Sequence, residues 1–179
     1  MNLKIKTLSF ITLAAFGAAS MQSCSPDRAK AYNARTDVNA NGLAFIKGAH
    51  EGGLTEIEAS KIAQKISTNK AVTDFAAMMI KDHSEAGTEV DKLADEKQVF
   101  VRDSVNHEHK ILLDSLSKKS GAGFDKAYIE MMVKDHEEAE ELFKEGKEST
   151  YADIRELSEK IYPKIKAHLE SAISINKSL

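Results

Sequence analysis

The sequence predicts an all-α protein, and three features lead to this prediction. From about residue 38 onward the chain is rich in Ala, Glu, Lys, Ile and Leu, and Pro163 is the only proline of that region. Apolar residues recur there at intervals of three and four, the periodicity of a helix with one buried face. No segment alternates apolar and polar residues for long enough to indicate a strand. We expect a four-helix bundle with a long helical crossover between its second and third helices.

The first residues predict a signal peptide and not a part of the fold. Lys4 and Lys6 form a positive n-region, residues 8–19 are apolar or small, and Cys24 follows shortly after. The apolar stretch is too short to span a bilayer. Cys24 is the only cysteine, so the chain cannot form an intramolecular disulfide. A lone thiol at this position predicts lipid attachment; the alternative is an ordinary signal peptide followed by an incidental cysteine.

These features divide the chain into a lipoprotein signal peptide (1–23), a flexible tether (24–36) and one helical domain (37–179). Cleavage before Cys24 would remove 23 of the 179 residues and two lysines, taking the formal charge from −3 to −5. An acidic domain without a basic patch argues against a nucleic-acid partner. No later apolar run approaches the roughly 18 residues of a membrane span. We therefore expect an outer-membrane lipoprotein that faces the periplasm or the cell surface.

Turn-forming and capping residues predict where the helices begin and end. The expected helices cover about residues 38–67, 69–97, 103–118, 122–148 and 151–179, with Thr68-Asn69 and Ser149-Thr150 as caps, a weak point at Gly52-Gly53 and a kink at Pro163. The short third segment of about 16 residues would cover roughly 24 Å. It is long enough to return along the bundle, so the long helices before and after it should run parallel.

Two of the expected helices carry the same short segment. Residues 78–83 read MMIKDH and residues 131–136 read MMVKDH, an internal repeat with an offset of 53 residues. Both histidines lie on apolar seams, and both lie about 13 or 14 residues, near 20 Å, from the start of their helix. In parallel helices, His83 and His136 should therefore lie at the same depth.

This pattern allows two interpretations. The plainer one is a pair of buried neutral imidazoles that hydrogen-bond across the bundle, with methionines filling the core. The other is a metal site, in which imidazole with thioether would favour copper, particularly Cu(I), and imidazole with carboxylate would suit zinc or iron. The candidate ligands are His83, His136, Met79, Met132, Asp82, Asp135, Glu56 and His168.

The last two candidates lie on the first and fourth long helices, within about two turns of the same level. Glu56 and His168 each continue an apolar seam, so either would complete the site or lie as a solvated charge at its rim. Gly52-Gly53 and Pro163 reach this level too. Two irregular helices there would leave a small polar cavity; the alternative is that the glycines permit close packing and the proline only bends its helix. His107 and His109 belong to the crossover, where we expect surface residues.

These motifs resemble the bacterial family called domain of unknown function 4142, whose members carry outer-membrane labels and belong to the ferritin-like superfamily. The resemblance covers about residues 37–173 and rests on the segments 52–56, 78–83, 113–128, 135–136, 163 and 168–169. It implies a ferritin-like bundle and an envelope location, but no agreed activity. Di-iron proteins of that superfamily use Glu-x-x-His. Ile80 and Val133 stand where those glutamates would be, so we expect no ferroxidase or oxygenase chemistry.

Other catalytic motifs are missing from the sequence. It contains no Gly-rich phosphate loop, no nucleophile elbow and no His-Glu-x-x-His motif, so we do not expect an enzyme. The leading hypothesis is a lipid-anchored envelope domain that binds a partner or small ligand through its helical surface. The alternative is an envelope lipoprotein that binds copper, zinc or iron. Self-association into a homo-oligomer stays open.

The lipid anchor gives a first testable prediction. Cys24→Ser should release a soluble protein or leave an unprocessed precursor, because the anchor is a covalent lipid on that thiol. Membrane fractionation and the apparent mass of the expressed full-length chain measure the result. Normal processing together with retention in the membrane fraction would show that Cys24 is not lipidated.

Overall fold

The computed structural model describes residues 36–179, and all regular secondary structure in this part is helical. The helices are α2 (Ala40–Ile66), α3 (Lys70–Glu96), α4 (His107–Ser117), α5 (Gly121–Gly146) and α6 (Ala152–Ser178). The all-α prediction is confirmed. The predicted signal peptide, Cys24 and the tether up to residue 35 lie outside the described residues. Within the described residues, none of the helices combines the length and apolar character that a membrane span needs.

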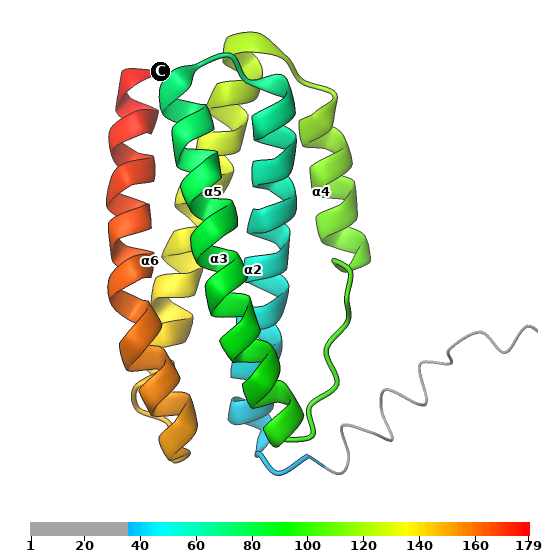
Figure 1. The fold of residues 1–179 in the computed structure, drawn as a ribbon, viewed down its shortest axis with the longest axis vertical. Helices are drawn as coiled ribbons and strands as arrows, with labels where there is room; N and C mark the ends of the chain where they lie inside the picture. Colours follow the sequence, from blue (N-terminus) through cyan, green and yellow to red (C-terminus); the bar gives the residue numbers. More distant parts are fainter. Residues whose placement is uncertain (1–35) are drawn as a thin grey trace, which may run out of the picture.

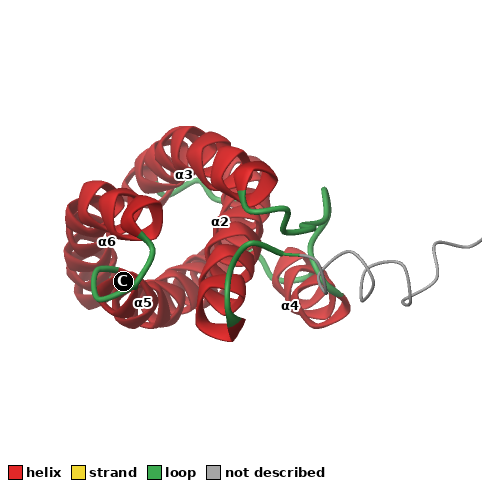
Figure 2. Ribbon diagram, turned by 90° about the horizontal axis from the view of Figure 1, so that it is seen from below, coloured by secondary structure: helices red, strands yellow, loops and turns green. Residues whose placement is uncertain are grey.

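The four long helices pack side by side around a common core (Figures 1 and 2). α2 packs against α3 and α5, and α6 packs against the same two helices, so α3 and α5 face each other diagonally. In Figure 1 α3 and α5 run downward while α2 and α6 run upward. α4 lies outside the group against α2 and α5 and returns the chain to the upper end. α3 and α5 are therefore parallel, as the length of the connection predicts.

Asparagine side chains set the starts of three helices. The Oδ1 atoms of Asn39, Asn69 and Asn106 accept hydrogen bonds from backbone N–H groups at 3.0, 3.0 and 2.9 Å respectively. Each bond satisfies a donor that the first helical turn leaves without a partner. The third bond explains why α4 begins at His107, four residues after its predicted start at 103.

Two other sequence predictions need correction. α6 has Tyr151 as its N-cap, without a side-chain cap, where we expected Ser149-Thr150. Ser149 Oγ instead accepts a hydrogen bond of 3.2 Å from the Tyr151 backbone N–H, which forms a turn before the helix. The weak point at Gly52-Gly53 does not interrupt α2, since packing on α3 and α5 supports the helix on both sides.

The core consists of two hydrophobic clusters stacked along the bundle. The upper cluster includes Met79, Phe124, Tyr128 and Met132, and the lower one includes Phe45, Val90, Phe143, Ile161 and Ile165. On every long helix a polar residue separates the two clusters. These residues are Glu56 on α2, His83 on α3, His136 on α5 and His168 on α6. We call this set the polar layer.

The close approach of α5 to its neighbours at its last turn gives a second prediction. A Cβ atom added to Gly146 would overlap Ser158 Oγ and lie 2.5 Å from Phe45 Cε2. Gly146→Ala should therefore lower the free energy of unfolding by about 1–3 kcal/mol, the usual cost of overpacking. Gly123→Ala is the control, because a Cβ there has no atom within 4 Å. Urea unfolding measures both, and equal stabilities would contradict the packing argument.

Candidate metal centre

The polar layer brings together four side chains from four helices. Glu56, His136 and His168 are 3%, 0% and 4% exposed, and the His83 side chain is 12% exposed. The ring centroids of the three histidines are 5.4, 5.4 and 5.5 Å apart, so the rings form a nearly equilateral triangle. This arrangement follows from the fold, because each histidine occupies a core-facing position at the same level of its helix.

One carboxylate holds two of the rings. His83 Nδ1 lies 3.0 Å from Glu56 Oε2, and His136 Nδ1 lies 3.1 Å from Glu56 Oε1 and 2.9 Å from the carbonyl oxygen of Met132. All three partners are acceptors, so we place the imidazole proton of both rings on Nδ1. Each ring then has a lone pair on Nε2.

A second carboxylate pairs with the third ring, and it does so through the other ring nitrogen, Nε2. His168 Nε2 lies 3.0 Å from Asp82 Oδ2, which leaves the lone pair of His168 on Nδ1. His83 Nε2, His136 Nε2 and His168 Nδ1 are buried and make no hydrogen bond within the described residues. One ring nitrogen from each histidine lies within 4.8 Å of the others. Each of the three rings thus has one buried nitrogen without a hydrogen-bond partner, and the three rings lie close together.

The spacing of the rings agrees with a single bound ion. Metal–nitrogen bonds of about 2.0–2.1 Å, with a ring nitrogen about 1.1 Å from its centroid, place the centroids of three ligating imidazoles about 5.1–5.5 Å apart. The three observed separations of 5.4, 5.4 and 5.5 Å lie at the upper end of this range.

The electrostatics of the layer favour neutral imidazoles at two positions. Burial lowers the pKa of His136, and Glu56 only partly opposes this effect. Burial also lowers the pKa of His168 to about 4, with the His83 and His136 charges adding to the effect and Asp82 opposing it. For His83 burial acts in the same direction, but the adjacent Glu56 carboxylate outweighs it and raises the pKa. The Glu56 pKa is lowered, because its histidine neighbours outweigh burial.

A cavity of about 540 Å³ lies beside the polar layer. Gly52, Gly53, His83, His168 and Asp135 belong to its lining. A Cβ on Gly52 would have no atom within 4 Å, and one on Gly53 would meet only His83 Nδ1, at 3.8 Å. α2 borders the cavity with two glycines, as expected. The prediction of a small polar cavity needs correction, because apolar residues such as Val90, Leu142 and Ile165 line much of it and Pro163 does not belong to its lining.

The remaining candidate ligands have other surroundings. Met79 and Met132 are fully buried in the upper hydrophobic cluster. Asp135 lines the cavity, where burial and then the Glu56 charge raise its pKa to about 7. The Asp82 carboxylate pairs with His168 and with no other candidate ligand. Of the eight candidate ligands, the three histidines lie together, and the carboxylates of Glu56 and Asp82 contact their rings.

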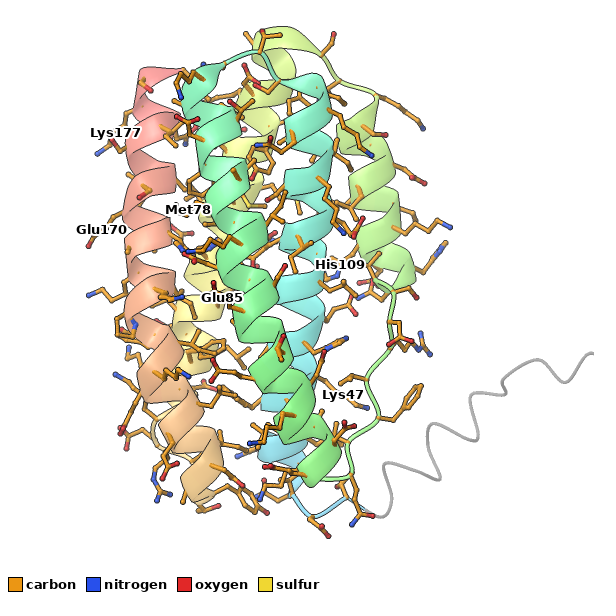
Figure 3. All side chains as sticks on the ribbon, in the orientation of Figure 1. Lys47, Met78, Glu85, His109, Glu170 and Lys177 are labelled. Atoms are coloured by element: carbon orange, nitrogen blue, oxygen red, sulfur yellow. The ribbon has the colours of Figure 1, made fainter. Side chains whose placement is uncertain are left out.

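His109 is partly exposed, as expected for the crossover, but it also has partners on α2. It is half-buried at the lower end of α4, between that helix and α2 (Figure 3). Its Nδ1 atom lies 2.7 Å from Glu51 Oε1 and 3.0 Å from Thr55 Oγ1. His50 makes a similar pair with Asp91 Oδ1 at 2.7 Å. Both histidines line the cavity, and the sequence contained no signal for these partners, because they are contributed by different helices.

Comparison with known proteins extends this description. Residues 27–175 match the family model described as Domain of unknown function (DUF4142). A similar solved structure is the crystal structure of a DUF305 fragment from Deinococcus radiodurans, with a TM-score of 0.70 and 10% identity. The match covers 79% of this chain and 98% of that one. At this identity the likeness concerns the fold alone. No curated protein matches the chain.

The depressed pKa of His168 gives a third prediction. The folded value of about 4 lies below the ordinary 6.5, so between these values the unfolded chain binds a proton that the folded chain does not. This contribution to stability is complete above about pH 6.5 and is lost as the pH falls through 4. In metal-free protein, wild type should therefore lose on the order of 2 kcal/mol more than His168→Gln between these pH values. Urea unfolding of both proteins at a series of pH values measures this, and parallel pH curves would contradict it.

Proposed function

The chain belongs to the DUF4142 family, whose function is undefined, and we propose from its buried site that it binds a transition-metal ion through His83, His136 and His168. The convergence of three buried imidazole nitrogens without hydrogen-bond partners carries the proposal. Leaving a buried polar atom without a partner costs about 1–3 kcal/mol. A metal ion would satisfy all three nitrogens at once.

The carboxylates support the same proposal. In metal sites a ligating histidine usually donates its other N–H to a carboxylate or a backbone carbonyl, which fixes the tautomer and the ring orientation. Glu56, Asp82 and the Met132 carbonyl stand in these positions. The two carboxylates would also balance the charge of a divalent ion in a buried layer.

The donor set narrows the choice of metal. Three imidazole nitrogens suit copper or zinc, both of which bind well to histidine-rich sites. Iron fits less well, because the carboxylate-rich Glu-x-x-His pattern of di-iron bundles is missing. We also propose that the four long helices form a ferritin-like bundle. The parallel orientation of α3 and α5 and the crossover through α4 support this.

Binding, without catalysis, is the role that we propose. The three unpartnered nitrogens are buried and the sequence carries no catalytic motif, although His83 and His168 also border the cavity. The N-terminal pattern around Cys24 supports a place in the cell envelope, where a lipid would anchor the domain to the membrane. The proposed role is thus metal binding or buffering by an envelope lipoprotein.

Metal titration against thermal unfolding provides the fourth prediction. Cu(I), Zn(II) and Fe(II) are added to the untagged chain and to His83→Gln, His136→Gln and His168→Gln. Wild type should gain about 2.7 kcal/mol when free metal is a hundredfold above the dissociation constant. Each variant should lose most of that gain. The effect should weaken as the pH falls, first through protonation of His83, whose pKa is raised, and near pH 4 through protonation of His168 as well, because a protonated imidazole cannot ligate.

His107→Gln is the matched control, because His107 is exposed on α4 and should leave the metal response unchanged. Identical melting curves with and without every metal would refute the proposal. A metal response that survives all three core substitutions would also refute it and would place binding on surface histidines or carboxylates.

A further inference from the structure

We propose that the cavity beside the polar layer binds a small organic cation with a hydrocarbon body, such as an arylalkyl primary amine. This proposal goes beyond metal binding and does not depend on it. The cavity volume of about 540 Å³ falls within the range of about 300–1,000 Å³ that is usual for small-molecule sites. Its lining reaches the surface, since Asp91, with a side chain 55% exposed, forms part of it.

One part of the lining is apolar. It includes Ala49, Ala86, Val90, Leu142, Phe143 and Ile165, contributed by four different helices. Part of this wall belongs to or packs against the lower hydrophobic cluster and is therefore held in place by the core. A hydrocarbon or aromatic group lying on it would bury apolar surface on both sides. The wall thus selects a ligand with a compact apolar body.

The charged part of the lining selects the head group. Six carboxylates line the cavity, against the amine of Lys164 and four histidine rings. The carboxylates are Glu51, Glu56, Asp82, Asp91, Asp135 and Glu138, and the histidines are His50, His83, His109 and His168. An anionic ligand would be repelled by this excess of negative charge, whereas a cation would be attracted.

Asp135 is the carboxylate available to such a cation. Glu51, Glu56, Asp82 and Asp91 pair with histidines, and Glu138 pairs with Lys134 at 3.0 Å. Asp135 makes no hydrogen bond or salt bridge of its side chain anywhere in the range 36–179, although it is only partly exposed. An ammonium group beside it would supply the missing donor. The ligand class is therefore a cationic head joined to an apolar body.

Gly52 offers a way to close the cavity without harming the fold. A side chain at this position would project into open space, and replacement of glycine inside a helix is favoured by helix propensity. Gly52→Leu should therefore occupy the site and leave the bundle intact. Gly123→Leu is the matched control, because Gly123 also has open space around its Cβ position but lies outside the cavity lining.

The experiment uses three probes of similar body and different charge on the full mature chain freed of metal by a chelator. The probes are 2-phenylethylamine, 2-phenylethanol and 3-phenylpropanoate, and calorimetry gives their dissociation constants. We expect the amine to bind at least about tenfold more tightly than the alcohol, and the carboxylate not to bind. Gly52→Leu should abolish amine binding, and Gly123→Leu should retain it.

Asp135→Asn separates the role of the head group from that of the wall. This nearly isosteric variant should bind the amine and the alcohol with similar affinities, because the apolar wall remains. Equal binding of all three probes by wild type, or binding of none, would overturn the proposal. So would amine binding that persists in Gly52→Leu, since it would then occur at surface carboxylates. Because no metal is present, these outcomes leave the metal proposal to its own titration.

Discussion

The Glu56 carboxylate shared between His83 and His136 is the interaction on which the arrangement of the centre depends. It joins α2 to both α3 and α5, and the Asp82–His168 pair joins α3 to α6. Burying so many ionisable groups costs free energy that an apolar layer of the same volume would not incur. Stability alone therefore does not explain the layer, which agrees with the proposed role in metal binding. The two hydrophobic clusters pack above and below the layer and hold the rings in place.

The topology turns a sequence repeat into a spatial one. Because α4 returns the chain to the upper end, α3 and α5 start at the same end, and equal positions along them lie opposite each other. Antiparallel helices would have separated the two repeated histidines along the bundle axis. The glycines of α2 then leave room on one side of the layer, where the cavity forms. Layer and cavity are thus products of one arrangement of helices.

Much of the fold could be predicted from local signals. Periodicity located the long helices, and apolar seams indicated an inward position for Glu56 and His168 without excluding a solvated one at the rim. The shared use of Glu56 by two histidines could not be predicted, because it depends on side-chain orientation across three helices. The roles of His109 and Asn106 were missed for a similar reason. Their partners Glu51 and Thr55 are more than 50 residues away in the chain, and nothing in a single sequence connects them.

The distribution of the histidines over the helices has a kinetic consequence. His83 belongs to the hairpin formed by α2 and α3, whereas His136 and His168 belong to the hairpin formed by α5 and α6. An ion held by all three would act as a clasp between the two hairpins, and neither hairpin alone would retain the complete ligand set. Parting of the hairpins would then separate His83 from His136 and His168, so the retention of the ion would depend on how often the bundle opens.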